Sequence, residues 1–287
     1  MNYLLALTQF VGFFAVAPYI GNLFWPSLIE FQHAHSLSDV QLVLIVQIVW
    51  HTFILLFANL CWCLVYKAKL ATFEKHKINN APWPWEESPK QWNSFFKKSL
   101  LLVGFNSLVV LPFVTITASF LKGFKTEFNL HPDQIPSGFH IFLQCLFNFL
   151  LEDFLFHLSH RLLHWKYLYP YIHKVHHKYR VSVSIAAEFA HPADYIITSL
   201  LPSSAGSILM ESKMHLFTQM VWYVVRITET AEGHSGYDLP WSPFRVLPFT
   251  TSPAYHDFHH YENTGNYSSA FRHWDTFFGT NKSYYRY

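Results

Sequence analysis

Residues 139–164, FHIFLQCLFNFLLEDFLFHLSHRLLH, decide how this chain is built. At about 1.5 Å per residue, the apolar part at 139–158 is long enough for a helix to cross a hydrocarbon core of about 30 Å. It runs directly into His160 and His164, two side chains of the type that most often ligates transition metals. The stretch therefore predicts a membrane-spanning helix with candidate metal ligands at its end.

The composition of the 287 residues excludes several classes of protein. Hydrophobic residues make up 51% and charged residues only 13%, which leaves too little charge to cover an ordinary soluble globule. The net charge of +2 provides no strong field, so no nucleic-acid partner is expected. The three cysteines lie in apolar runs, which argues against a disulfide scaffold and against a thiolate metal site. Histidine is unusually frequent, with 19 residues against 20 Lys and Arg together.

Two further uncharged runs are long enough to cross a membrane. Residues 40–66 and 99–121 hold no Asp, Glu, Lys or Arg over 27 and 23 residues. The loop between them, 67–98, holds seven Lys against three Glu, so the positive-inside rule places it in the cytoplasm, or in the matrix if the membrane is mitochondrial. Three tryptophans of this loop are expected in an interfacial aromatic belt: Trp83, Trp85 and Trp92.

The later apolar segments decide on which side the histidines lie. Residues 193–209 and 214–228 predict a hairpin, and two passes return the chain to the side from which it started. Residues 157–191 and 234–287 are therefore expected on the cytoplasmic face, together with the basic loop. The first run, 4–24, is also apolar, and a true span and an interfacial helix both stay open for it.

Three groups of histidines are spaced for metal binding. Residues at i, i+3 and i+4 of a helix share one face, so each group can direct two or three imidazoles at a common point. Together they supply eight nitrogen ligands, enough for two metal ions. One H-x-x-x-H arises by chance in so histidine-rich a chain, but two H-x-x-H-H groups do so with a probability well under about 0.01. The groups are H-x-x-x-H at His160 and His164, and H-x-x-H-H at His173, His176 and His177 and at His256, His259 and His260.

Other polar residues near these groups are weighed one by one. His234 follows the last apolar run on the same side and is expected to be a further ligand. For His157 and His191 a role outside the ligand set is favoured, and no other histidine has a partner at ligand spacing. Asp153 lies on one helical stripe with His157 and His160. Two roles stay open for its carboxylate, a hydrogen bond to the second nitrogen of a ligating imidazole or a place near the membrane interface.

The predicted fold is all-α, a multi-pass membrane helical bundle with a histidine-rich, two-metal cap on the cytoplasmic side. An all-nitrogen site accepts zinc, iron or copper, and affinity alone does not choose among them. A site beside a membrane suggests an apolar substrate that enters from lipid and offers mostly C–H bonds. Zinc is redox-silent and cannot oxidise these bonds, whereas two irons with dioxygen can. This favours a di-iron hydroxylase or desaturase whose site also accepts zinc as a substitute.

The histidine groups and the residues around them resemble the 4-methylsterol monooxygenases of the fatty acid hydroxylase/sterol desaturase superfamily. The similarity covers about residues 91–280, roughly two thirds of the chain, and the ordered set is far more specific than any single piece. The pieces are Glu152-Asp-Phe, His160-Arg-Leu-Leu-His164, Tyr171-Ile-His-Lys-Val-His-His177, Ala187-Glu-Phe-Ala-His-Pro192, His234-Ser-Gly-Tyr-Asp238, His256-Asp-Phe-His-His260, Gly265-Asn-Tyr267, Trp274-Asp275 and Phe278-Gly-Thr280.

The resemblance implies a function and a set of ligands. It implies two iron ions held by the eight motif histidines and His234, with no catalytic residue beyond the metal centre. The reaction would be the successive oxidation of a sterol 4-methyl group by dioxygen, through alcohol and aldehyde to the carboxylate. Electrons would come from NAD(P)H through a cytochrome b5-like carrier, since the chain has no G-x-G-x-x-G and no C-x-x-C-H haem site.

The resemblance also divides and locates the chain. It separates the N-terminal membrane segments and basic loop, 1–90, from a fatty acid hydroxylase/sterol desaturase domain, 91–287. It implies the endoplasmic reticulum, but residues 283–287 differ from the lysine-rich tail of many relatives, so the mitochondrial inner membrane stays an alternative. Relatives also often carry His where this chain has Phe156. Two rival functions stay open: a hydroxylase or desaturase of another sterol or a fatty acyl lipid, and an accessory subunit of a membrane complex.

Overall fold

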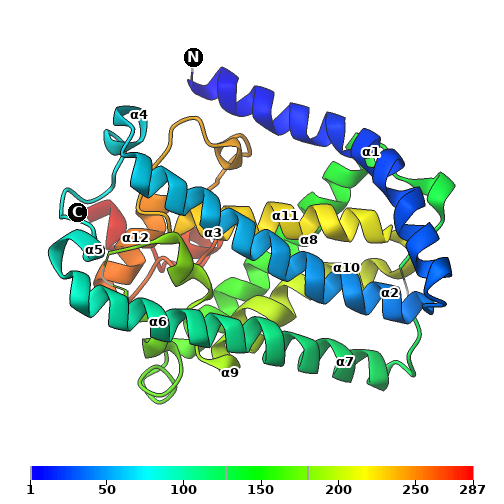
Figure 1. Ribbon diagram of the computed structural model, residues 1–287. Coiled ribbons are helices and arrows are strands. Elements are labelled where there is room, and N and C mark those ends of the chain that lie inside the picture. Colours follow the sequence, from blue (N-terminus) through cyan, green and yellow to red (C-terminus); the bar gives the residue numbers. More distant parts are fainter. Residues whose placement is uncertain (1, 127, 180, 287) are drawn as a thin grey trace.

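Helices make up nearly all of the structure, a computed structural model that describes residues 2–126, 128–179 and 181–286 (Figure 1). Among these residues there are three isolated β-bridges and no extended strand, so the predicted all-α class is confirmed. Within the same ranges, four helices are long and apolar enough to cross a membrane: Asn2–Ala34, Asp39–Ala68, Pro89–Leu121 and Gly138–Leu163.

These four helices follow the apolar runs of the sequence, with two changes. α1 (Asn2–Ala34) extends past the run 4–24, and its length and composition make it a candidate span. It bends in its middle (Figure 1), where Pro18 and Pro26 remove backbone hydrogen bonds. The third helix begins at Pro89, well before the uncharged run that predicts it, because proline at the first helical position starts the helix early.

Three of the helical segments contain a π-helical turn. Such a turn inserts one residue and widens the helix locally, often near a functional site. Two of the turns lie within candidate spans, and the third lies in the later hairpin. The segments are α2 (Asp39–Ile45), η1 (Val46–Trp50) and α3 (His51–Ala68); α6 (Pro89–Phe105), η2 (Asn106–Val110) and α7 (Leu111–Leu121); and α9 (Pro192–Asp194), η6 (Tyr195–Leu200) and α10 (Leu201–Met210).

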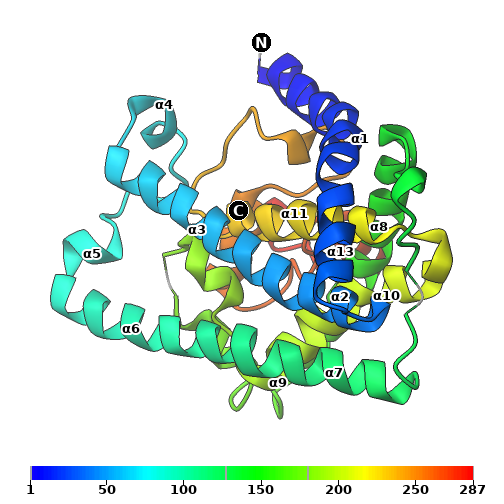
Figure 2. The same ribbon diagram turned by 45° about the vertical axis from the view of Figure 1, so that its right-hand side comes forward.

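The predicted hairpin forms, and it packs inside the bundle. α10 lies against α8 (Gly138–Leu163), and α11 (Leu216–Gly233) lies against α3 and α8. Both views place α11 in the middle of the molecule (Figures 1 and 2). Neither helix is among the candidate spans, and α11 carries Arg226, Glu229 and Glu232. The hairpin still enters and returns, so the chain after it lies at the end where α8 stops.

The histidine-bearing segments and the basic loop lie at the same end of the molecule. In Figure 1 this end holds α4, α5, α12 and the C-terminus, while α2 and the end of α7 lie at the opposite end. Backbone hydrogen bonds of 2.8–2.9 Å join the loop to the segment after α11. This agrees with the predicted topology. The bounds are α4 (Ala71–Glu74), α5 (Pro84–Glu87), α12 (Pro253–Glu262), α13 (His273–Phe278), and the short helices η3 (Pro132–Gln134), η7 (Glu211–Lys213), η8 (Pro243–Arg245) and η9 (Tyr284–Arg286).

The tryptophans of the basic loop do not form the predicted interfacial belt. Trp83 is only 1% exposed and stacks on Trp85, with ring centroids 5.2 Å apart. It also contacts Tyr66 on α3 and Tyr237 after α11, at 5.0 and 5.4 Å between centroids. Trp92 packs edge-on against Trp85. The loop folds back onto α3, because an aromatic cluster buries more apolar surface than a belt at the interface would.

Candidate metal centre

Nine histidines come together in two adjacent clusters, and they are the nine that the sequence predicts as ligands. They lie in α8 and directly after it, in η4 (His173–Lys178), directly after α11, and in α12. Within each cluster, one nitrogen of every imidazole lies within 4.8 Å of the others. Cluster A is His160, His164, His173, His177 and His259, and cluster B is His176, His234, His256 and His260.

Each H-x-x-H-H group directs two imidazoles at one common point, as the spacing predicts, and its third imidazole joins the other cluster. In η4, His176 joins cluster B and its two partners join cluster A. In α12, His259 joins cluster A, while His256 and His260 join cluster B. In α12, neighbouring residues point about 100° apart, so His259 and His260 face different clusters. The His177 and His260 rings, 4.6 Å apart between centroids, connect the clusters.

The nitrogens of cluster B face one another at distances that suit a metal ion. His256 Nε2 lies 3.0 Å from His234 Nε2 and 3.1 Å from His260 Nε2. His234 Nε2 lies 3.4 Å from His176 Nε2. Two nitrogens that bind one ion at about 2.1 Å lie roughly 3.0–3.4 Å apart when the bond angle is about 90–110°. The four lone pairs therefore converge on a volume that fits one transition-metal ion.

Cluster A fits a metal for a different reason, because its nitrogens are buried without partners. In the described part of the chain, no hydrogen bond reaches Nε2 of His160, His164, His173 or His259, or either ring nitrogen of His177. Leaving one buried polar group unpaired costs about 1–3 kcal/mol. Five such imidazoles in one place are therefore costly unless an ion coordinates them.

Burial keeps these imidazoles neutral, which is the form that binds a metal. It lowers the pKa of His234 and of His259 to about 3, and that of His176 to about 4. It also lowers the pKa of His177 and His260, and the neighbouring imidazoles add to the effect. At neutral pH each of these rings keeps a lone pair for coordination.

Backbone carbonyls hold two rings of cluster A through the nitrogen that faces away from the cluster. His160 Nδ1 donates to the carbonyl oxygen of Tyr267 at 2.8 Å. His259 Nδ1 donates to the carbonyl oxygen of Gly265 at 2.6 Å. Such a bond fixes the tautomer and the ring orientation and leaves Nε2 for the metal.

Two more rings are held in the same manner from the hairpin. His234 Nδ1 lies 2.9 Å from the carbonyl oxygen of Thr230 in α11. His173 Nδ1 lies 2.7 Å from Oδ2 of Asp194, whose Oδ1 accepts the hydroxyl of Thr198 at 2.9 Å. Sequence reasoning missed Asp194, because its partner His173 lies 21 residues away in the sequence and the contact depends on how the hairpin packs.

Asp153 has no hydrogen bond to a histidine among the described residues, so the direct contact considered for it is absent. Its Oδ1 accepts the backbone N–H groups of Ser269 and Ala270, at 3.1 and 2.7 Å. These residues belong to the loop 265–270, which also supplies the two carbonyls of cluster A. The carboxylate therefore supports the site through the loop, a role that side-chain spacing does not reveal.

Asp275, the second buried carboxylate of this region, holds the same loop from α13. It accepts the backbone N–H groups of Tyr267 and Ser268, each at 2.9 Å. It also accepts the hydroxyls of Tyr255 and Thr280, at 3.0 and 2.6 Å. Four donors thus fix the carboxylate of Asp275, and this carboxylate holds the loop whose carbonyls orient cluster A.

Two histidines considered as ligands lie outside both clusters. His157 Nδ1 is 3.3 Å from the hydroxyl of Ser268 and 3.5 Å from Asp275, so this ring also supports the loop. His191 Nδ1 accepts the backbone N–H of Ala193 at 3.2 Å and caps the start of α9. The ligand set predicted from spacing therefore needs neither of them.

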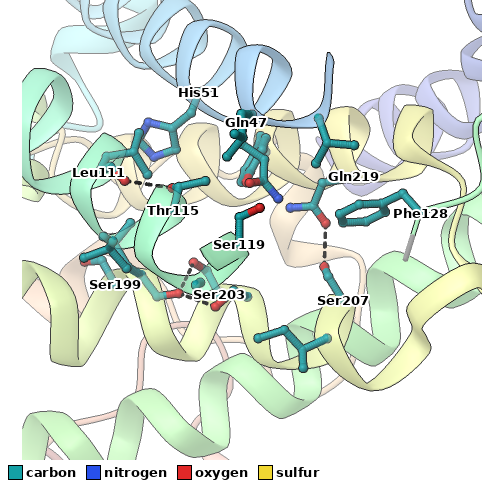
Figure 3. Close-up of a pocket in the computed structure, with 18 of the residues that line it drawn as sticks. Gln47, His51, Leu111, Thr115, Ser119, Phe128, Ser199, Ser203, Ser207 and Gln219 are labelled. Atoms are coloured by element: carbon teal, nitrogen blue, oxygen red, sulfur yellow. Dashed lines mark hydrogen bonds between the residues drawn. The ribbon is translucent and has the colours of Figure 1, made fainter. Parts of the chain in front are cut away.

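A mostly apolar cavity of about 210 Å³ lies between α2, α3, α7, α10 and α11. Figure 3 shows polar side chains directed into its middle part, among them Gln47, Ser119 and Gln219. One of the residues that line the cavity is Thr230, whose carbonyl holds His234. The cavity thus approaches cluster B from within the bundle.

Paired all-histidine sites on a bundle of membrane-length helices define a class of membrane metalloprotein, and the comparisons with known proteins identify the family. A profile described as fatty acid hydroxylase matches residues 145–280. The very-long-chain aldehyde decarbonylase GL1-8 of Oryza sativa subsp. indica is 37% identical over 219 residues, which cover 75% of this chain and 77% of that protein. Methylsterol monooxygenase 2-2 of Arabidopsis thaliana is 38% identical over 194 residues, 65% and 68% of the two chains. Methylsterol monooxygenase 1 of Gallus gallus is 34% identical over 215 residues, which cover 75% of this chain and 69% of that protein. No solved structure is significantly similar.

The chain belongs to the fatty acid hydroxylase family. The matched region begins within α8 and ends just after α13, so it contains all nine clustered histidines. The resemblance drawn from the sequence, including that to methylsterol monooxygenases, is confirmed. The names of the relatives cover sterols and aldehydes, so membership alone does not choose the substrate.

Proposed function

We propose that the chain is a membrane di-iron monooxygenase that oxidises the 4-methyl group of sterol precursors with dioxygen. The observation that carries this proposal is the pair of adjacent all-histidine clusters beside an apolar cavity. Relatives named methylsterol monooxygenase support a sterol substrate. Two bound iron ions with dioxygen would supply the oxidising power for a C–H bond, which redox-silent zinc lacks.

The proposed roles of the chain's own residues are ligation, orientation and exclusion of water. The carbonyls and carboxylate bonded to Nδ1 keep four of the rings in one tautomer, and no catalytic residue is needed beyond the metal ligands. The apolar cavity walls would hold the sterol rings and keep water from the reacting carbon. The proposed ligands are His160, His164, His173, His176, His177, His234, His256, His259 and His260.

The proposal includes partners outside the chain. Electrons would reach the metals from NAD(P)H through a cytochrome b5-like carrier at the end where the histidines lie. The membrane would be that of the endoplasmic reticulum, with the mitochondrial inner membrane as the alternative. Zinc would occupy the same ligands without supporting the reaction. The division at residues 90 and 91 likewise stays a prediction.

A second candidate substrate is a long-chain aldehyde. The relative named aldehyde decarbonylase, 37% identical over 219 residues, favours it. An apolar cavity that approaches cluster B suits an acyl chain with a terminal reacting carbon as well as a sterol. Other sterols, fatty acyl lipids and an accessory role in a membrane complex remain as outcomes of the same test.

The test uses the full-length iron-loaded protein in membranes with its electron donors. A 4,4-dimethyl sterol and a long-chain aldehyde are supplied in parallel, and the products are identified by mass spectrometry. We expect the 4-carboxysterol. An alkane from the aldehyde, with the sterol unchanged, would support the second candidate. Absence of turnover on either lipid, with metal bound and a membrane complex that dissociates without this chain, would support the accessory role.

Single substitutions in the two clusters test the ligand assignment. His177→Ala and His259→Ala each remove a proposed ligand nitrogen for which no neighbouring side chain can substitute, and sterol oxidation should fall at least about 100-fold. The protein should still reach the membrane. His131→Ala is the matched control, because this histidine is exposed and lies outside both clusters. Equal activity in all three variants would contradict the assignment.

A further inference from the structure

Glu188 is a buried carboxylic acid that the metal centre does not use. It ends η5 (Ser184–Glu188), lines the cavity, and is only 7% exposed. No hydrogen bond reaches its Oε2 atom from any residue that the structure describes. Burial raises the pKa of this carboxyl to about 7. A buried acceptor without a partner is costly, so the group is suited to a donor that a ligand brings.

The cation that interacts with Glu188 already has two other carboxylate partners. Arg226 on α11 lowers the pKa of Glu188 through its charge. Its guanidinium, however, donates to Glu152 on α8 and to Glu229 on its own helix, each at 2.8 Å. The hydroxyl of Tyr195 interacts electrostatically with Glu188 and is likewise buried without a partner in the described ranges. The Arg226 contacts thus tie α8 to α11 and leave Oε2 of Glu188 buried without a hydrogen-bond partner among the described residues.

We propose that Glu188 binds a hydroxyl group of the lipid substrate and thereby determines which carbon faces cluster B. The proposal rests on the proposed function and deepens it. η5 packs against α11, and Glu188 interacts electrostatically with Arg226, which lies one helical turn before Thr230. Thr230 holds His234 of cluster B through its carbonyl. A hydroxyl bound by Glu188 therefore lies on the side of the cavity that adjoins the metals.

The chemistry of a 4-methyl sterol fits this position. Its 3-hydroxyl stands on the ring carbon next to the one that carries the methyl group, so a group that anchors the hydroxyl has to lie beside the metal. A carboxyl oxygen accepts the hydroxyl proton in a hydrogen bond. A long-chain aldehyde brings no hydroxyl donor. The carboxyl therefore favours a hydroxylated lipid, and it favours the orientation that places the neighbouring carbon at the metals.

The cavity also offers a matched control. Gln47 on η1 is a polar residue directed into the middle part of the cavity (Figure 3). A hydroxyl bound in the middle of the cavity would depend on Gln47, whereas a hydroxyl bound beside the metals would depend on Glu188.

The experiment compares a 4,4-dimethyl sterol with its 3-deoxy counterpart. The iron-loaded wild type and the variants Glu188→Leu, Glu188→Gln and Gln47→Leu are assayed for kcat/KM with both sterols, and equilibrium binding of both is measured without electron donors. The wild type should prefer the hydroxylated sterol by about 10- to 100-fold. Glu188→Leu should abolish this preference and leave the 3-deoxy sterol unaffected. Glu188→Gln should retain part of it, because an amide oxygen still accepts a proton.

Each outcome decides between explanations. Full preference in Glu188→Leu would overturn the proposal, and loss of preference in Gln47→Leu alone would move the hydroxyl to the middle of the cavity. Equal metal content in all variants shows that Glu188→Leu is folded, and Glu188→Gln repeats the test if it is not. If the wild type oxidises neither sterol, the proposed function fails. The binding preference then still decides whether Glu188 recognises a hydroxyl.

Discussion

An imidazole binds a metal more firmly when its second nitrogen is held as well. Among the rings in the two clusters, His173 has the strongest hydrogen-bond acceptor at Nδ1. This acceptor is the charged carboxylate of Asp194, at 2.7 Å, whereas the other acceptors are neutral carbonyls. The Thr198 hydroxyl in turn fixes that carboxylate. Such an arrangement raises the basicity of Nε2 and prevents the ring from rotating. Asp194 thus acts on the metal through His173.

Asp194→Ala should weaken metal binding by about 10- to 100-fold while the helices remain folded. The physical reason is that His173 loses the partner that fixes its tautomer. Asp194→Asn should lose less, because the amide oxygen still accepts. Competition titration with a metal chelator measures the effect. Asp133→Ala, at an exposed position in η3, is the control. Unchanged affinity in Asp194→Ala would show that the contact does not orient His173.

The clustered histidines were predictable from the sequence, but most of the groups that hydrogen-bond to them were not. Histidines at i, i+3 and i+4 stand out because the helical repeat places them together. His160 and His259 are held by backbone carbonyls, which every residue possesses, so nothing in the sequence marks Tyr267 or Gly265 for this role. The division of each H-x-x-H-H group between two clusters also depends on where the neighbouring helices lie.

At the scale of helices, the position of the hairpin depends on a close approach between α10 and α8. A Cβ atom added at Gly206 would lie 2.2 Å from Oδ1 of Asn148 and 3.0 Å from its Cα. Asn148 is buried, and its Oδ1 accepts the Ser207 hydroxyl at 3.4 Å. The helices can therefore touch at this level only because residue 206 has no side chain.

Gly206→Ala should lower the free energy of unfolding by about 1–3 kcal/mol, because α10 has to move away from α8. Since α10 continues into η6 and Asp194, metal binding should weaken as well. Thermal unfolding in detergent, followed by circular dichroism, measures the first effect. The control is Gly104→Ala in α6, where nothing lies within 4 Å of the added atom. This change should be neutral or stabilise by up to about 1 kcal/mol. Equal melting of the two variants would contradict the packing argument.

The whole fold was predictable in its helices and only partly in their packing. Charge-free runs longer than about 20 residues leave few alternatives to a membrane-length helix, so the spans at 40–66 and 99–121 follow from the sequence. Trp83 was expected at the interface but lies in a buried aromatic cluster. The sequence did not reveal this cluster, because the partners Tyr66 and Tyr237 are distant from Trp83 in the sequence. The cavity likewise depends on five helices whose neighbours no local pattern identifies.

The orientation of the whole molecule in its membrane is the last prediction. Four candidate spans bring the chain back to the side on which it started, and the loop 67–98 with its seven Lys lies at the same end as the histidines. The segment 122–137 at the other end holds two Lys against two acidic residues, so the positive-inside rule assigns the histidine end to the cytoplasm.

The test uses single cysteines in a chain without its native ones and a reagent that does not cross membranes. Lys75→Cys and Lys282→Cys should react from the cytoplasmic side, and Lys125→Cys only after the membrane is opened. Labelling of Lys75→Cys and Lys282→Cys from opposite sides would contradict the even number of spans, and labelling of all three from one side would contradict the spans themselves.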